Sequence, residues 1–228
     1  MWSKSRTYLC PMNKMTEIKE DIRIVEVGME KKSSIFIVYY NSMIDFIDIS
    51  YLAHGNDKQQ LVYRILCEHQ ILNKLNVYKP IVVGTIPIEI DIPNSDVDII
   101  CEVSDFNQFH VLVKKEFSEF EGFDFQIQES HYVANFSIDG LPIEIYAENK
   151  PTQYQNAYLH MMIEYRLIQL LGADFQASII NLKLQGYKTE PAFGKLLGLQ
   201  NPYIDLLELE RKTNKELFEI DVCRKQKP

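Results

Sequence analysis

Cysteine is scarce in this sequence of 228 residues, and the four cysteines show no pairing pattern. They lie far apart, with no C-x-x-C motif and no histidine at metal-ligand spacing: Cys10, Cys67, Cys101 and Cys223. Such spacing predicts neither a disulfide framework nor a zinc site, and it is typical of a reduced, cytoplasmic protein.

Long apolar runs and a surplus of basic residues are also missing. The run "IFIVYY" at 35–40 is too short to span a bilayer, and no apolar stretch precedes a cleavage site near the N-terminus, so we expect neither a membrane span nor a signal peptide. The formal net charge of -8 argues against nonspecific nucleic-acid binding, although a local basic groove stays open. With 46% hydrophobic and 25% charged residues, the composition is that of a soluble globular protein.

Positive charge is absent from one stretch in particular. Between Pro80 and Val113 there is no lysine or arginine, yet six carboxylates occur there: Glu89, Asp91, Asp96, Asp98, Glu102 and Asp105. Most of this stretch, "VVGTIPIEIDIPNSDVDIICEV" at 82–103, is otherwise apolar and typical of strands. Its negative charge therefore has no compensation within the segment itself.

Two of these acids have the spacing of a metal-binding pair. Side chains alternate faces along a strand, so Asp96 and Asp98 share one face, ~6–7 Å apart, while their neighbours point into a core. In "PIEIY", Glu144 stands alone between two isoleucines. If the two strands are neighbours, three carboxylates converge, and Mg²⁺ or Mn²⁺ would relieve their repulsion. Two such ions ~3.5–4 Å apart can hold the attacking and leaving oxygens of a phosphoryl displacement.

The spacing alone leaves alternatives open. "IEIDI" at 88–92 shows the same alternation, with Glu89 and Asp91 on one face, and a half-exposed antiparallel strand gives that pattern without any metal. Gly84-Thr85, after an apolar strand, suits close approach of a phosphate, but it also suits an ordinary strand end. Periodicity does not decide between these interpretations.

The order of predicted elements indicates an α+β fold: a mixed sheet with flanking helices and a helical C-terminal half. "IDG" at 138–140 predicts a tight turn between two strands. Strands are predicted at 80–85, 88–92, 96–103, 123–128, 132–138 and 141–148. Helices are predicted at 57–76, 105–120, 156–172, 174–186, 189–199 (with Thr189 as N-cap) and, in one or two pieces, 202–220.

Taken together, these motifs resemble the nucleotidyltransferase superfamily, whose founding fold is that of DNA polymerase β. The shared pattern is an apolar strand ending in Gly84-Thr85, ten further residues, Asp96-Val97-Asp98 and later Ile143-Glu144-Ile145. Many members enter a helix directly after the first motif, whereas here Pro87 and "IEIDI" predict an extended segment or hairpin.

More narrowly, the chain resembles an uncharacterised bacterial family of small nucleotidyltransferase-like proteins. The matching text is "VGTIPIEIDIPNSDVDIICEV", "NAYLHMMIEYRLIQLLG" and "KTEPAFGKLLGLQNPY", and the resemblance runs from about Met43 to Leu209. We therefore expect Met43 to be the real start. The predicted segments are an extension at 1–42 that is not native to the domain and packs poorly, a nucleotidyltransferase-like core at 43–150, a helical region at 151–221 packed on that core, and a frayed tail at 222–228.

The superfamily resemblance implies roles for individual residues. Asp96 and Asp98 would bind two Mg²⁺ (or Mn²⁺) ions, and Glu144 would hold the catalytic ion and help to activate an acceptor hydroxyl. Gly84 and Thr85, together with Ser95 in the turn before the aspartates, would contact a nucleoside triphosphate. The implied reaction transfers a nucleoside monophosphate from that triphosphate to the acceptor.

A bound triphosphate needs positive charge from outside 80–113. Arg166 lies in an otherwise apolar helix, so it needs a partner, either a phosphate or a nearby acid such as Glu164. Lys188 precedes a helix start and is either an anion-binding residue or a solvated lysine. His160 and Glu164 share a helix face at i, i+4, where they bond each other or reach the site as a base or metal ligand. We name Arg166, Lys188 and His160 as nucleotide-binding candidates.

The leading hypothesis is thus an Mg²⁺-dependent nucleotidyltransferase with an unidentified hydroxyl-bearing acceptor. The net charge favours a small molecule or a protein over nucleic acid as that acceptor. One alternative is an inactive module of the same fold that binds a nucleotide or a protein, for example in a toxin–antitoxin pair. Another is a structural domain with solvated carboxylates. A distance of more than about 10 Å from Glu144 to both aspartates would exclude the first two hypotheses together.

Overall fold

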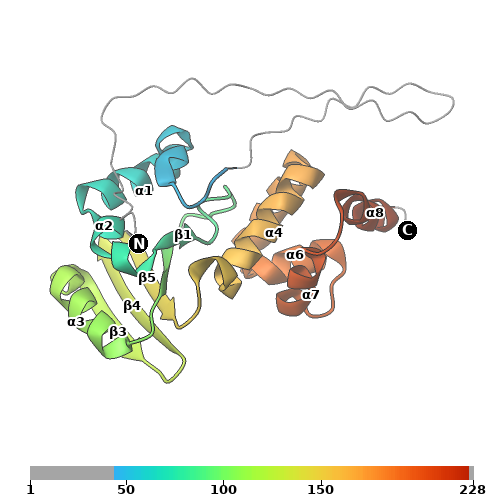
Figure 1. The fold of residues 1–228 in the computed structure, drawn as a ribbon. Coiled ribbons are helices and arrows are strands. Elements are labelled where there is room, and N and C mark those ends of the chain that lie inside the picture. The colour runs from blue at the N-terminus through green and yellow to red at the C-terminus, as the bar shows by residue number, and fades with distance from the viewer. Residues whose placement is uncertain (1–43, 226–228) are drawn as a thin grey trace.

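The computed structural model describes residues 44–225, which Figure 1 shows as a coloured ribbon. The extension predicted at 1–42, the choice of Met43 as the start and the run "IFIVYY" lie outside these residues. Within them, the α+β prediction is confirmed, because a five-stranded mixed sheet packs against helices on both faces.

The strands follow the order β1-β2-β5-β4-β3 across the sheet. Their bounds are Ile81–Val83 for β1, Val97–Glu102 for β2, Glu121–Ile127 for β3, His131–Ile138 for β4 and Leu141–Glu148 for β5. β2 and β5 are parallel, and each other adjacent pair is antiparallel. Parallel neighbours need a long connection, and here helix α3 and strands β3 and β4 supply it.

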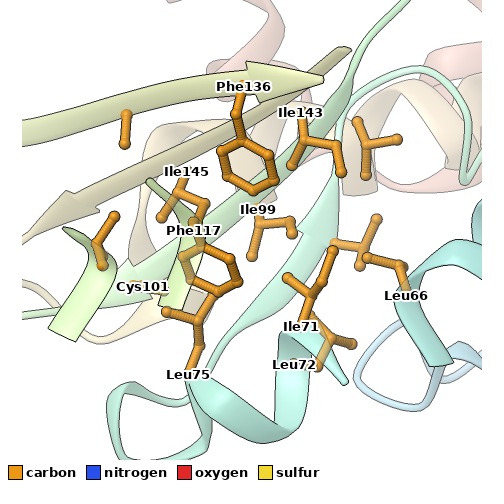
Figure 2. Close-up of a cluster of buried hydrophobic side chains, with 14 of the residues drawn as sticks. Leu66, Ile71, Leu72, Leu75, Ile99, Cys101, Phe117, Phe136, Ile143 and Ile145 are labelled. Atoms are coloured by element: carbon orange, nitrogen blue, oxygen red, sulfur yellow. The ribbon is translucent and has the colours of Figure 1, made fainter. Parts of the chain in front are cut away.

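One face of the sheet carries helices from the first half of the chain. They are α1 (Asp57–Glu68), α2 (Ile71–Lys74) and α3 (Phe106–Phe117), with the 3-10 turns η1 (Ile49–His54) and η2 (Asn76–Tyr78) beside them. Figure 2 shows the core beneath them, where Ile99 of β2 and Ile143 and Ile145 of β5 meet Phe117 and Leu72. The odd-numbered residues of β2 and β5 thus point to this core, which turns the even-numbered ones to the opposite face.

The helices of the second half pack on that opposite face. They are α4 (Asn156–Leu171), α5 (Ala173–Leu184), α6 (Thr189–Leu197), α7 (Pro202–Leu209) and α8 (Asn214–Lys225), after the 3-10 turn η3 (Thr152–Tyr154). Val83 and Ile100 of the sheet join their core. Helix α8 runs into the predicted tail as far as Lys225. Across residues 44–225, each helix is too short or too polar to cross a membrane.

Two local signals in the sequence have the expected structural effect. Asp139 and Gly140 both have positive φ, at 52° and 76°, which is the backbone of the tight turn predicted between β4 and β5. At the start of α1, Asn56 and Gln59 form a reciprocal capping box. The single helix predicted at 57–76 is wrong, however, because Gln70 takes a left-handed φ of 53° and separates α1 from α2.

The strand predicted at 88–92 is also wrong. The segment is a compact turn, in which the Glu89 N–H bonds the Ile86 carbonyl at 3.2 Å and the Ile90 N–H bonds the Thr85 carbonyl at 3.1 Å. Glu89 has a left-handed φ of 59°. Ile86, Ile88 and Ile90 are all buried, which explains the strand-like alternation in the sequence. They belong to two different cores, however: Ile86 to the core under the N-terminal helices, and Ile88 and Ile90 to the core under the C-terminal helices.

Cys101 of β2 is a free thiol buried in the core, and burial raises its pKa.

Candidate functional site

Asp98 and Glu144 lie directly opposite each other on the parallel strands β2 and β5. Parallel neighbours are roughly 4.8 Å apart, and both residues have the even-number parity that faces the C-terminal helices. Asp96 immediately precedes β2. All three acids line a cavity of about 710 Å³ between the sheet and these helices. The wide separation that would have excluded a shared site is not observed.

The electrostatics of this group are those of carboxylates crowded without a counter-ion. Burial, Asp96 and Glu144 raise the pKa of Asp98 to about 8, although Lys183 opposes the shift. Burial and Asp96 also raise the pKa of Glu144. Within residues 44–225, no hydrogen bond or salt bridge is found for either carboxylate. Oxygen donors packed this closely fit a hard divalent cation such as Mg²⁺, which would stabilise their charged forms.

Gly84 places backbone directly against the Asp98 carboxylate. It follows β1, whose last residue, Val83, pairs with Asp98 across the sheet. Gly84 has φ +82°, and a Cβ at this position would collide with Asp98 Oδ2. Glycine fits both the backbone conformation and the space, and it brings the Gly84-Thr85 motif beside Asp98. Thr85 also lines the cavity.

The loop from 84 to 96 is held by helix α1 on one side. Gln59 is buried, and its Nε2 donates to the Ile86 carbonyl at 2.9 Å. Lys58 Nζ donates to the carbonyls of Ile92 at 3.1 Å and Ser95 at 2.9 Å. These bonds fix a segment that has no strand of its own, and they set the approach of the chain to Asp96.

Helix α5 holds the same loop from the other side. Gln176 Nε2 donates to the Glu89 carbonyl at 2.9 Å, and Lys183 Nζ donates to the Ile90 carbonyl at 2.7 Å. Lys183 is buried, and this burial lowers its pKa to about 8. Loop contacts of this kind, from a lysine or a glutamine to a backbone carbonyl, leave no pattern in a sequence.

Ser95 has a structural partner within its own turn. Its Oγ accepts a hydrogen bond from the Ile92 N–H at 2.9 Å, and it lies 3.4 Å from Thr85 Oγ1. Both hydroxyls line the cavity, so the structure brings them to the place where contact with a triphosphate is predicted.

Among the described residues, three lysines line the cavity: Lys150, Lys183 and Lys188. Lys188, the candidate named from the sequence, is the N-cap of α6, one residue before the predicted Thr189. Lys150 gives no signal because a lysine in a loop is ordinarily solvated.

Arg166 does not line the cavity, and neither partner considered for it is found. Its guanidinium donates instead to the segment between α7 and α8: Nε to Asn214 Oδ1 at 2.9 Å, Nη1 to the Glu210 carbonyl at 3.0 Å and Nη2 to the Lys212 carbonyl at 2.6 Å. The apolar helix around Arg166 indicated correctly that the charge needs partners, and these are two backbone carbonyls and the Asn214 side chain.

Arg166→Ala is expected to destabilise the protein without changing nucleotide binding. Removing three hydrogen bonds to one connection should cost about 1–3 kcal/mol, because charged donors contribute more than neutral ones. Thermal unfolding and nucleotide titration measure the two effects. The exposed neighbour Arg211→Ala is the control and should match the wild type in both. A loss of nucleotide affinity in Arg166→Ala at unchanged stability would contradict this assignment.

A second group of ionisable side chains lies on the helical wall of the same cavity. His160 and Glu164 of α4 meet Glu190 of α6, with one ligand atom from each within 4.8 Å of the others. Burial raises the pKa of Glu164 well above its usual value, and it lowers the pKa of His160. The i, i+4 spacing of His160 and Glu164 indicated a shared face, but Glu190 comes from another helix and gave no signal.

Several solved structures are similar to this chain at low sequence identity. One concerns the RNA terminal uridylyl transferase Cid1 (13% identity, TM-score 0.48, 65% of this chain and 52% of that one). Another concerns a cytoplasmic RNA terminal U-transferase (13% identity, TM-score 0.43, 68% of this chain and 47% of that one). A third concerns the polymerase core of TRAMP, an RNA surveillance complex (14% identity, TM-score 0.37, 75% of this chain and 61% of that one). The chain spans about half the length of the first two.

Comparison of the sequence with family models identifies the family to which the chain belongs. Among curated proteins, none matches this chain. A family model described as a domain of unknown function, DUF4269, matches residues 64–209, which include β1, β2, β5 and the helices from α4 to α7. The candidate acids, the Gly84-Thr85 motif and the second group all lie inside this match. The chain belongs to the DUF4269 family.

Proposed function

We propose that this protein is a Mg²⁺-dependent nucleotidyltransferase that transfers a nucleoside monophosphate from a nucleoside triphosphate to a hydroxyl-bearing acceptor. The observation that carries the proposal is the register of β2 and β5, which sets Asp98 opposite Glu144 in one cavity with Asp96 beside them. A structural sheet gains nothing from half-buried carboxylates at adjacent positions, since their repulsion opposes folding.

The residues have distinct roles in this proposal. Asp96, Asp98 and Glu144 would hold two divalent ions. These ions would neutralise part of the phosphate charge and lower the pKa of the acceptor hydroxyl. Lys150, Lys183 and Lys188 supply positive charge to the triphosphate from the other walls. The Gly84 backbone and the Thr85 hydroxyl stand where phosphate oxygens would approach Asp98. Asp98 keeps its proton near neutral pH in the ion-free site, so occupation of the site releases that proton.

The size of the cavity agrees with a nucleotide and a small acceptor group. A volume of about 710 Å³ falls within the roughly 300–1,000 Å³ of typical small-molecule sites. A small molecule or a protein side chain is the favoured acceptor, because the net charge of -8 opposes nonspecific approach of nucleic acid. A nucleotide-binding module without catalysis is the alternative outcome.

The decisive experiment combines nucleotide binding with label transfer. We expect the full-length protein to bind at least one of the four ribonucleoside triphosphates in the presence of Mn²⁺, by calorimetry, and to transfer an α-phosphate label to a component of a lysate. Glu144→Gln should weaken Mn²⁺-dependent nucleotide binding by about tenfold or more and abolish label transfer, because one ion ligand is lost.

The matched control is Glu102→Gln. Glu102 lies on β2 outside the cavity, 2.6 Å from Lys79, so this variant should retain both properties. Nucleotide binding without label transfer to any acceptor would support the binding module. No Mn²⁺-dependent nucleotide binding at all would reject both functions.

A further inference from the structure

Three potential metal ligands meet on the helical wall of the cavity, and none of them belongs to the carboxylate group on the sheet. His160 and Glu164 lie one turn apart on α4, and Glu190 lies in the first turn of α6. The three ligand atoms all lie within 4.8 Å of one another. Each residue lines the cavity.

Two of these side chains are buried, each with a polar atom that no other described residue satisfies. His160 is 9% exposed and Glu164 is 4% exposed. Within the described part of the chain, His160 Nδ1 and Glu164 Oε1 have no hydrogen-bond partner. Leaving such an atom unpaired costs about 1–3 kcal/mol, and more where it is charged, so native proteins seldom leave two together. Both atoms therefore indicate a ligand that the polypeptide does not provide.

The His160 ring offers a buried nitrogen that is free to bind a ligand. Within residues 44–225, its Nδ1 has no hydrogen-bond partner. A neutral imidazole with an unoccupied ring nitrogen is the commonest metal ligand among side chains.

The positive charge of Lys183 acts on Glu164 and opposes the rise of its pKa. Its Nζ donates to the Ile90 carbonyl at 2.7 Å, and Glu164 Oε1 has no hydrogen-bond partner within residues 44–225. The lysine therefore fixes the loop and offsets part of the negative charge without forming a hydrogen bond to Oε1.

We propose that His160, Glu164 and Glu190 form a binding site for a transition-metal dication, Zn²⁺ in the first instance, separate from Asp96, Asp98 and Glu144. One imidazole nitrogen and two carboxylate oxygens suit Zn²⁺ better than Mg²⁺, which prefers oxygen ligands alone. Three protein ligands leave one position open, as in catalytic zinc sites, and a donor atom of a molecule in the cavity can occupy it. The site follows from its own donor set and does not depend on the transfer reaction.

A Zn²⁺ titration of the full-length protein tests this site without any assay of activity. After metal removal, the protein competes with a chromophoric chelator for Zn²⁺, and we expect one tight equivalent. Glu164→Gln and Glu190→Gln should each weaken Zn²⁺ binding by at least roughly 10–100-fold. This is the loss that follows removal of a residue that only hydrogen-bonds a metal ligand, and loss of a ligand itself should cost no less. The Asp98→Asn/Glu144→Gln double variant should keep it. Exposed His54→Gln and Glu208→Gln are the controls and should resemble the wild type.

Nitrogen NMR of the histidines identifies the ligand atom. We expect Zn²⁺ to shift the Nδ1 resonance of His160 and to leave its Nε2 protonated. Glu164→Gln keeps the shape of the side chain and removes a buried acid, so circular dichroism should show a folded variant. Unchanged Zn²⁺ affinity in both glutamine variants would overturn the proposal. So would loss of Zn²⁺ binding in the double variant alone, which would place the ion on the sheet.

Discussion

Asp98→Asn is expected to stabilise the ion-free protein and to slow the proposed nucleotidyl transfer by at least about a thousandfold, because the variant loses a proposed metal ligand worth several kcal/mol to that reaction. The stabilising effect follows from the pKa of Asp98, which is raised from the 3.8 of an ordinary aspartate to about 8 in the folded protein. Between these values the folded state holds a proton that the unfolded state has released, so the wild type loses stability as pH rises through this window. The asparagine variant has no such loss.

The size of the effect is measurable by thermal unfolding. Allowing for the partial exposure of Asp98, the gain at pH 8 should be about 1–3 kcal/mol, or roughly 2–10 °C in the unfolding midpoint. The measurement compares the variant with the wild type at pH 5 and pH 8 in the presence of a chelator. Adding Mg²⁺ should reverse the order, because it stabilises the wild type alone. A stability difference that stays constant between the two pH values would refute this account of Asp98.

Gly84→Ala is expected to impair the site through its shape, with every ionisable group still present. The new Cβ would collide with Asp98 Oδ2 and displace the carboxylate. A shift of about 1 Å in a catalytic group can cost on the order of a hundredfold in rate. Because Gly84 has φ +82°, the alanine also strains the backbone by about 1–2 kcal/mol. Steady-state kinetics and Mn²⁺ titration should show the first effect and thermal unfolding the second.

Gly140→Ala separates these two contributions. Gly140 also has a positive φ, +76°, but a Cβ there meets nothing within 4 Å. This variant should show a similar loss of stability with wild-type Mn²⁺ affinity and transfer rate. If Gly84→Ala retained full activity, the close contact between the glycine and Asp98 would have no functional meaning.

Much of the sheet was predictable because its strands follow simple periodic rules. The alternation in 96–103 and 141–148 gives β2 and β5 nearly to the residue, and the Asp139-Gly140 turn marks the end of β4. The sequence predicted that Asp98 and Glu144 meet only if their strands are neighbours, because sequence periodicity does not say which strands pair. The register between distant strands is decided by the packing of α3, β3 and β4 around them.

The segment at 88–92 shows why periodicity failed at the site itself. Buried isoleucines at alternate positions look like a strand, yet they divide between two cores once the chain turns at Glu89. The contacts that hold this turn come from Gln59, Gln176 and Lys183, residues that lie far away along the chain. Glu190 was missed for the same reason, since it meets His160 only because α5 and α7 each pack against both α4 and α6.

The loop from 84 to 96 has a mechanical consequence. It is bound to α1 by Lys58 and Gln59 and to α5 by Gln176 and Lys183, so it bridges the helices on the two faces of the sheet. Any rocking of the C-terminal helices over the sheet must break several of these bonds at once. The C-terminal helices and the sheet are therefore expected to move together as one rigid unit and not to open and close around the cavity. Exposed side chains that line the cavity, such as those of Lys188 and Tyr187, can still move without breaking the bonds of this loop.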